Sequence, residues 1–253
     1  MKSTPGEPSG SSGVEGRPVR SVLSIFRLRA AKLPPTHMPL MTTPSKPAVH
    51  STRSIGINFL ILLLFMLSGV AALIYQVCWQ RSLFSLLGVD LESTTIVVSV
   101  FMFGLGCGAL LGGRFADAYP DRRILGFAVA ETAIGIYGYC SPHLIHFIAA
   151  NSGLGYSHAS NLIKSFAVLI VPTTLMGATL PILVTHLFAQ EKSIGVSVGK
   201  LYFANTMGGA IGAALATFYL FMVMGISDSV RVASAINVFV AATAYGIFGL
   251  LRR

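Results

Sequence analysis

Apolar residues dominate the chain from Ile55 to Leu251, in six stretches that polar residues interrupt mainly at their ends. Each stretch has about the ~20 apolar residues that a helix needs to cross a bilayer. The stretches are apolar on nearly every face, whereas a helix of a soluble domain keeps a polar face at helical period. We therefore predict membrane spans at 55–79, 94–113, 124–149, 162–188, 198–224 and 229–250.

Lipid offers the backbone no hydrogen-bonding partner, so only helices or a closed barrel can cross it. The ten-residue alternation of apolar and polar side chains that marks a barrel strand is absent from the sequence. The predicted fold is all-α, a polytopic membrane bundle of six transmembrane helices at 55–253. The composition agrees, because 53% of the residues are hydrophobic and only 11% are charged, with a mean hydropathy of +0.72.

A basic leader at 1–54 precedes the first span, and its composition predicts disorder. It is rich in Pro, Gly, Ser and Arg, which bury too little apolar surface to offset chain entropy. Its segment 20–33 alternates basic and apolar groups, which suits a short amphipathic helix on an anionic membrane or a mitochondrial transit peptide. The alternatives are a disordered cytoplasmic tail, or a true start at Met38 or Met41. The first span lies too far from Met1 for a cleavable signal peptide and is predicted to remain as an anchor.

The net charge of +9 suggests a nucleic-acid partner only until the charges are placed along the chain. All but three of the 18 Lys and Arg residues lie in the leader, in or beside the loops after spans two and four, or at the C-terminus. The exceptions are Arg81, Lys164 and Arg231. By the positive-inside rule both termini are cytoplasmic, as an even number of spans requires. We predict a multi-pass protein of the cell (cytoplasmic) membrane whose partner is the lipid bilayer and not nucleic acid.

Glycines at a spacing of four residues mark the second and fifth spans. Gly104, Gly108 and Gly112 lie in the second span, and Gly208 and Gly212 lie in the fifth. Small residues at this spacing form a flat helix face that another backbone can approach closely. We predict that these two spans are the tightly packed core helices of the bundle. Ordinary glycine enrichment in membrane helices is the alternative.

Two prolines, Pro172 and Pro181, lie within the fourth span. Proline removes a backbone donor and clashes with the preceding turn, so this span is predicted to be kinked or broken. Broken helices line substrate sites in transporters. Simple structural kinks are an equally good interpretation, because membrane helices tolerate proline when neighbouring groups satisfy the freed backbone.

Glu131 is the only acidic residue well inside a predicted span. A carboxylate at mid-membrane costs roughly 2.5–3.5 kcal/mol on the insertion scale, so it needs a reason to be there. It predicts either a site for a cation or proton, or a structural hydrogen bond to a neighbouring helix. The candidate substrate-binding residues are Glu131, Tyr75, Gln76, Tyr137 and Asn205.

Other polar residues in the spans have simpler interpretations. Trp79 and Arg81 close the first span and are predicted to anchor it at the interface. Asn237 is predicted to join helices through its amide. The three cysteines show no disulfide or metal spacing and are predicted to be small buried apolar residues. No nucleophile motif, P-loop or dinucleotide fingerprint is found in the sequence, so we predict no catalytic residue, metal or cofactor.

The loop after the second span resembles the conserved cytoplasmic loop of major facilitator transporters. It has Gly113, Asp117 four residues later, and then the basic pair Arg122 and Arg123. The loop departs from that pattern at two positions, where Ala118 replaces a basic residue and Pro120 replaces a glycine.

A closer resemblance covers nearly all of 60–248. The segments SGVAALIYQVCWQR, FMFGLGCGALLGGRFAD, PTTLMGATLP and GKLYFANTMGGAIGA resemble the membrane domain of fused spermidine-synthase-like proteins. In that family a bundle related to half of a major facilitator transporter precedes an aminopropyltransferase domain. The glycine-rich nucleotide-binding segment and acidic polyamine-site residues of that domain have no match here. The resemblance therefore implies a polyamine-linked membrane module, and it does not imply catalysis on this chain.

Three hypotheses for function follow. In the first, the bundle binds or moves a polyamine-like organic cation. Glu131 would supply charge, Tyr75 and Tyr137 aromatic faces, and Asn205 a hydrogen bond. Six helices are half of a facilitator bundle, so transport would need a homodimer or another partner. In the second, the bundle is a non-catalytic anchor for a separate soluble synthase. In the third, the chain is a fragment of a membrane-bound spermidine synthase.

Overall fold

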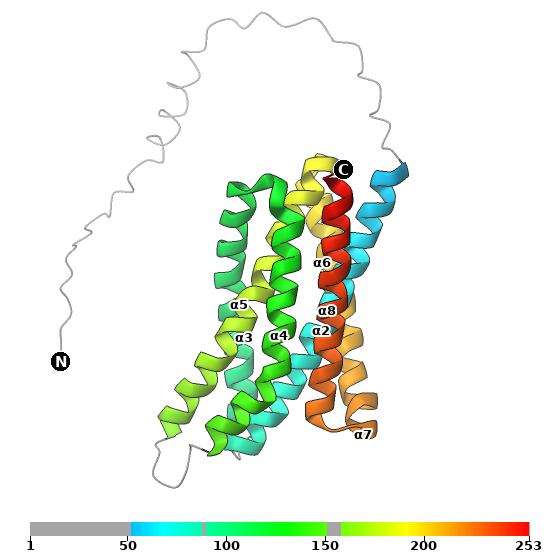
Figure 1. Ribbon diagram of the computed structural model, residues 1–253. Coiled ribbons are helices and arrows are strands. Elements are labelled where there is room, and N and C mark those ends of the chain that lie inside the picture. The colour runs from blue at the N-terminus through cyan, green and yellow to red at the C-terminus, as the bar shows by residue number, and fades with distance from the viewer. Residues whose placement is uncertain (1–51, 88–89, 151–157, 253) are drawn as a thin grey trace, which may run out of the picture. The chain divides into compact units, whose positions relative to one another are not determined.

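The structure is a computed structural model that describes residues 52–87, 90–150 and 158–252. Across these ranges it contains six helical segments long and apolar enough to cross a membrane, and no strand (Figure 1). The predicted all-α bundle of six spans is therefore confirmed. The leader, apart from its last three residues, lies outside the described residues.

Most helices run past the predicted spans, because apolar length measures the thickness of lipid and not the extent of the helix. The first helix, for example, continues eight residues beyond position 79. The fifth span is a helix that passes through a π-helical turn, η2, before its last residues. The elements are α2 (Thr52–Leu87), α3 (Asp90–Ala118), η1 (Pro120–Arg122), α4 (Arg123–Ala150), α5 (His158–Glu191), α6 (Ile194–Leu215), η2 (Ala216–Leu220), α7 (Phe221–Val223) and α8 (Ile226–Leu251).

The helix contacts repeat between the first three spans and the last three. The most extensive contacts join α3 to α5, α2 to α6 and α4 to α8, followed by α4 to α5 and α2 to α8. If spans one and four, two and five, and three and six are exchanged, the same five pairs of contacting helices result. Successive spans alternate in direction, so the exchange corresponds to an approximate two-fold axis in the membrane plane. Each of these contacts crosses between the two halves.

The spaced glycines lie where helices of the two halves meet. A Cβ added at Gly104, Gly108 or Gly112 would lie under 3.0 Å from atoms of α5, and one added at Gly208 or Gly212 would lie as close to the backbone of α2. Only a residue without a side chain permits such contact.

The two glycine-bearing helices are nevertheless outer helices of the bundle. The most apolar windows of α3 and α6 are 33% and 28% buried, against 44% for α2 and α5 and 50% for α4; that of α8 is also 33% buried. The glycine faces are tightly packed, as predicted, but the two helices are not the most buried of the bundle. Their glycine faces pack against α5 and α2, whereas their other faces carry exposed large apolar side chains such as Met102, Phe103 and Phe203.

The fourth span is one continuous helix, α5, with Pro172 and Pro181 inside it. Of the predicted kink or break, the break does not occur, and at Pro172 a neighbouring side chain satisfies the freed backbone. Pro172 has no N–H for the carbonyl of Val168, four residues earlier, and the Tyr137 hydroxyl of α4 donates to that carbonyl at 2.5 Å. In α4, Pro142 likewise frees the carbonyl of Gly138, which accepts from Ser141 Oγ at 2.8 Å.

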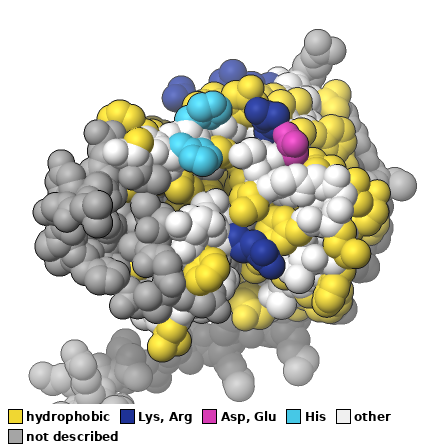
Figure 2. Space-filling model, turned by 90° about the horizontal axis from the view of Figure 1, so that it is seen from below, with side chains coloured by type: hydrophobic (Ala, Val, Ile, Leu, Met, Phe, Trp, Pro, Cys, Tyr) yellow, Lys and Arg dark blue, Asp and Glu magenta, His cyan; other side chains and the backbone are white. Residues whose placement is uncertain are grey.

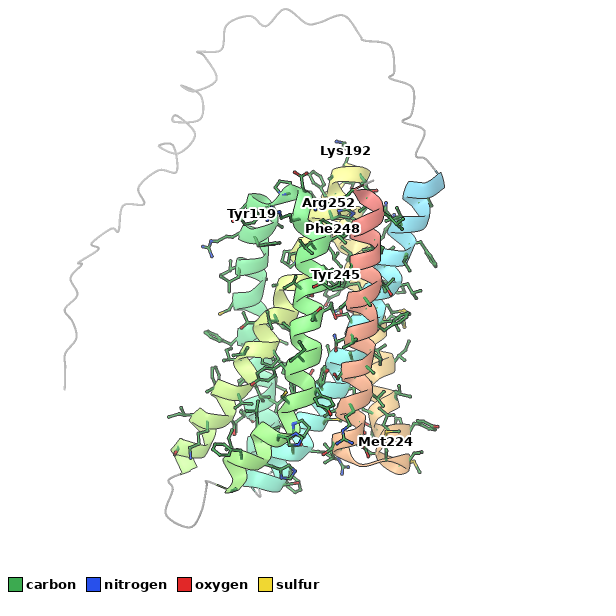
Figure 3. All side chains as sticks on the ribbon, viewed as in Figure 1. Tyr119, Lys192, Met224, Tyr245, Phe248 and Arg252 are labelled. Carbon is green, nitrogen blue, oxygen red and sulfur yellow. The ribbon has the colours of Figure 1, made fainter. Side chains whose placement is uncertain are left out.

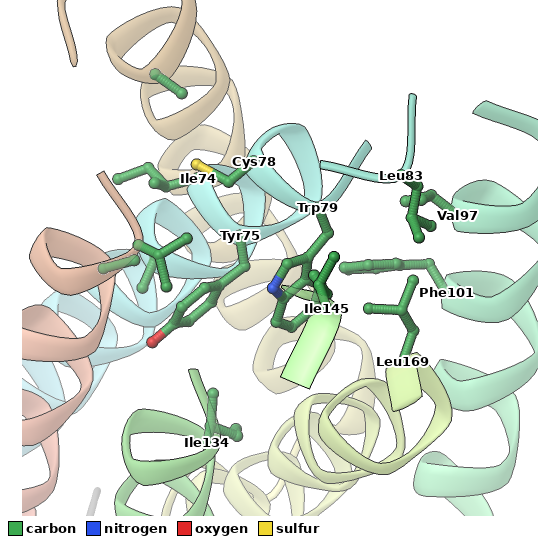
Figure 4. Packing of buried hydrophobic residues seen from close by; sticks show 14 of the residues in the cluster. Ile74, Tyr75, Cys78, Trp79, Leu83, Val97, Phe101, Ile134, Ile145 and Leu169 are labelled. Atoms are coloured by element: carbon green, nitrogen blue, oxygen red, sulfur yellow. The ribbon is translucent and has the colours of Figure 1, made fainter. Parts of the chain in front are cut away.

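Two apolar clusters fill the bundle at different depths. One contains Ile74, Trp79, Phe101 and Leu169 (Figure 4), and the other contains residues such as Phe65, Phe127, Leu183 and Leu201. Between the two clusters, α2, α4 and α8 each place at least one buried polar side chain inside the bundle. This polar layer is the candidate functional site.

Candidate functional site

Three helices contribute buried polar side chains to one layer of the bundle. Ser68 comes from α2, Glu131 from α4, and Ser234 and Asn237 from α8. Their spacing follows the helical period. Glu131, Gly135 and Gly138 share one face of α4, and Ser234 and Asn237 are three residues apart on α8.

The Glu131 carboxylate is fully buried, at 0% exposure, and accepts a hydrogen bond at each oxygen. Ser68 Oγ donates to Oε1 at 2.6 Å, and Asn237 Nδ2 donates to Oε2 at 2.6 Å. Ser234 Oγ donates to the Gly135 carbonyl at 2.8 Å. Glu131 therefore joins α4 to α2 and to α8, which is a sufficient structural reason for a carboxylate at this depth.

Two oxygens in this layer have no hydrogen-bond partner among the described residues. They are Asn237 Oδ1 and Tyr75 Oη, both buried. The Tyr75 hydroxyl lies near Ser234 and Glu131 and against Gly138, where a Cβ would collide with it. Buried polar atoms are generally paired, so these two atoms leave capacity for a donor such as water or an ammonium group.

Tyr75 is held in place by Trp79. The two rings stack with centroids 5.1 Å apart at 15°, and Trp79 Nε1 donates to Ser141 Oγ at 2.9 Å (Figure 4). Trp79 is only 1% exposed, so the prediction that it anchors the span at the interface is wrong. Ser141, next to Pro142, gives the indole N–H a partner inside the bundle. Arg81 remains exposed at the end of the span, 5.2 Å from the ring centre of Phe221.

The structure brings Glu131 and Tyr75 together, but it does not bring the other three candidate residues to them. Tyr137 donates to Val168 of α5, Asn205 packs against Gly69 at the contact of α2 with α6, and Gln76 is half-buried with no recorded bond to this layer.

Sequence reasoning missed Ser68 and Ser234, since a serine in an apolar span is a weak signal. Their spacing from Tyr75 and Asn237, at i+7 and i+3, places each pair on one helix face and was the available clue.

The loop that resembles the major facilitator loop contains one residue with a clear structural role. Arg123 donates from Nε to the Ala116 carbonyl at 3.0 Å and from Nη1 to the Thr185 carbonyl at 3.1 Å. It therefore fixes the start of α4 to α3 and α5. Asp117 and Arg122 are exposed, and a Cβ at Gly113 would meet nothing within 4 Å.

The three cysteines differ in their exposure. Cys78 is buried, Cys107 is half-buried and Cys140 is exposed, so the prediction of burial fails for Cys140. An exposed thiol on a membrane span faces lipid, where a small apolar group is equally acceptable. No group of three or more metal-ligating side chains occurs within the described ranges.

Three comparisons with known proteins bear on this chain. It is 27% identical to Polyamine aminopropyltransferase 1 of Streptomyces coelicolor, over 77% of this chain and 34% of that protein. It is 25% identical to Polyamine aminopropyltransferase 2 of the same organism, over 83% and 37%, and 23% identical to the Polyamine aminopropyltransferase of Oceanobacillus iheyensis, over 71% and 34%. No family model and no solved structure matches.

The chain therefore spans about a third of the length of the curated relatives it matches. The predicted resemblance to synthase-like proteins is confirmed over that part of their length. The resemblance to half of a major facilitator transporter remains a prediction.

Substitutions at Glu131 test whether its carboxylate stabilises the bundle. Glu131→Leu removes both acceptors and leaves the Ser68 and Asn237 donors unpaired, at a cost of about 1–3 kcal/mol each. Glu131→Gln keeps the shape and one acceptor. We expect the midpoint temperature of thermal unfolding, measured in one detergent, to fall by several degrees for Glu131→Leu and by less for Glu131→Gln.

Thr132→Val is the matched control, because Thr132 Oγ1 bonds only the carbonyl of Ala128 in its own helix. It should unfold close to the wild-type temperature. A Glu131→Leu protein as stable as the wild type would show that the carboxylate does not hold the three helices together.

Proposed function

We propose that this chain forms the membrane module of a polyamine aminopropyltransferase system and that the module anchors aminopropyl transfer at the bilayer. The observation that carries the proposal is the partial match. Proteins named polyamine aminopropyltransferase match over most of this chain but only about a third of their own length. The matched part is thus the part that forms helices of membrane length here.

The arrangement around Glu131 supports anchoring over transport. Both of its oxygens are already bonded, and its side chain has no exposed surface. A substrate cation at the carboxylate would have to fit beside the Ser68 hydroxyl and the Asn237 amide, inside a layer where the Glu131 side chain has no exposed surface. The carboxylate stabilises the bundle in the arrangement that an anchor requires.

The unpaired oxygens of the same layer favour a second candidate, the binding of a polyamine-like cation. An ammonium group has three donors, and Tyr75 Oη, Asn237 Oδ1 and the carboxylate are acceptors. The stacked rings of Tyr75 and Trp79 add an aromatic face for cation–π contact. Movement of such a cation would require the two three-span halves to rock apart, with a homodimer or a partner completing the pathway.

We further propose that the chain lies in the cell (cytoplasmic) membrane with both termini inside. Tyr119, Lys192 and Arg252 lie at one end of the bundle and Met224 at the other (Figure 3). The first end carries most of the basic residues of the described chain. At the opposite end, histidine side chains are visible at the surface (Figure 2), and His143, His146 and Arg231 line a pocket of about 230 Å³. This asymmetry supports the positive-inside orientation.

Thiol labelling with a reagent that cannot cross the membrane tests this orientation. Single cysteines at Lys192 and Ser227, placed in a chain whose own cysteines are replaced by alanine, mark the two ends. We expect Ser227→Cys to react in intact cells and Lys192→Cys to react only after the cells are opened. The reverse pattern, or equal labelling, would exclude cytoplasmic termini.

Affinity capture combined with an aminopropyl-transfer assay tests the anchor. The tagged full chain is extracted from its native membrane in mild detergent, and the eluate is assayed for transfer of an aminopropyl group to a labelled diamine. We expect activity with the wild type and equal activity with Glu131→Gln, because the anchor does not use the carboxylate for chemistry. The control is an unrelated tagged membrane protein from the same membranes.

Binding of labelled spermidine to the purified chain, measured in parallel, distinguishes the two candidates. Saturable binding that Glu131→Gln abolishes, together with an inactive eluate, would reject the anchor and favour the cation site. Activity in the eluate without Glu131-dependent binding would reject the cation site.

A further inference from the structure

A groove lies between α3, α4 and α5, at the end of the bundle where η1 joins α3 to α4. Its volume is about 430 Å³, within the range of roughly 300–1,000 Å³ for small-ligand sites. Apolar residues form nearly all of its wall, several of them small, and Arg122 is the one charged residue in its lining. The wall includes Gly112, Phe115, Gly126, Ala130, Ala133 and Ala178.

The groove follows from the way the three helices pack. Gly112 brings α3 against Ala178 of α5, while α4 also packs on α5. The helices α3 and α4 have little contact with each other beyond the tight turn that connects them. Small side chains on the facing side of α4 leave the space between them open, with α5 as its floor. The Phe115 ring lies against Gly126 and narrows the groove near Arg122.

The charged side chains at this end of the groove favour the binding of an anionic group. Arg122 is exposed, and the structure records no ion pair or hydrogen bond for its guanidinium within the described ranges. Arg114 is also exposed near the end of α3, and the Arg123 guanidinium is held by backbone carbonyls. Two exposed carboxylates, Asp117 and Asp121, oppose these three cations. The local balance remains positive.

We propose that this groove holds an acyl chain of an anionic phospholipid whose phosphate binds Arg122. The apolar wall alone gives no preference between lipids, because an acyl chain is as apolar as its surroundings in the bilayer. The guanidinium can bind the phosphate of any phospholipid through its fork of donors, and its positive charge gives the preference for a headgroup of net negative charge. The proposal requires membrane insertion but neither the anchor nor the cation site.

Native mass spectrometry of the purified full chain tests the site. The protein is titrated with phosphatidylglycerol and with phosphatidylcholine of the same acyl composition, and the first dissociation constant is measured for each. A basic residue near the surface contributes about 1 kcal/mol, so we expect phosphatidylglycerol to bind about fivefold more tightly. Arg122→Gln should reduce that preference to near unity.

Two further variants make the result specific to the groove. Arg231→Gln removes an exposed arginine at the opposite end, where it pairs with Asp228 at 2.7 Å, and should leave the preference unchanged. Ala133→Leu fills the groove without changing a charge and should weaken the first phosphatidylglycerol binding severalfold. Thermal unfolding in phosphatidylcholine checks that each variant is folded.

A preference that survives Arg122→Gln would overturn the proposal. So would an equal loss in Arg122→Gln and Arg231→Gln, which would indicate general attraction of anionic lipid to surface charge. In the combined variant of Arg122→Gln and Ala133→Leu the two losses in phosphatidylglycerol affinity should add, because one residue contacts the headgroup just before the start of α4 and the other lies beside the acyl chain, far along that helix. Unweakened binding by the combined variant would contradict the site.

Discussion

Close approach of backbones at glycine faces is the contact on which this bundle depends. Lipid provides no hydrophobic drive between helices, so association relies on van der Waals packing and interhelical hydrogen bonds. The contacts of α3 with α5 and of α2 with α6 provide the packing, and both join the first three spans to the last three. Neither half is a compact unit by itself, because the most extensive contacts of every helix are with the other half.

Hydrogen bonds between helices add to this packing. Some of them satisfy two groups that would otherwise lack a partner inside the bundle, an open backbone carbonyl and a carboxylate. Pro172 creates an open carbonyl that Tyr137 satisfies from the neighbouring helix. Glu131 draws donors from α2 and α8. A carboxylate that joins three helices has a structural role, and the proposed anchor requires nothing further of it.

Apolar length and spacing were sufficient to predict six spans and the class of the fold, because lipid permits few alternatives. They could not predict which helix contacts which. A glycine face reports that another backbone comes close, but not whose, and the glycine helices are accordingly outer rather than central. Trp79 was misassigned for a similar reason: its partner Ser141 is 62 residues away and becomes available only when α4 packs beside α2. Glu131 was recognised as unusual, whereas its partner Ser68 and the nearby Ser234 in the same layer were not, because an isolated serine in an apolar span is a weak signal.

Assembly of the bundle from two separate polypeptides tests the dependence on glycine faces most directly. Residues 1–150 and 151–253 are expressed together, with an affinity tag on the second half only, and the first half is measured in the detergent eluate. We expect the wild-type halves to co-purify in equal amounts. Gly108→Leu should abolish recovery of the first half, whereas Gly106→Leu, where a Cβ meets nothing within 4 Å, should preserve it. Equal recovery of the two variants, or no association of the wild-type halves, would contradict the account.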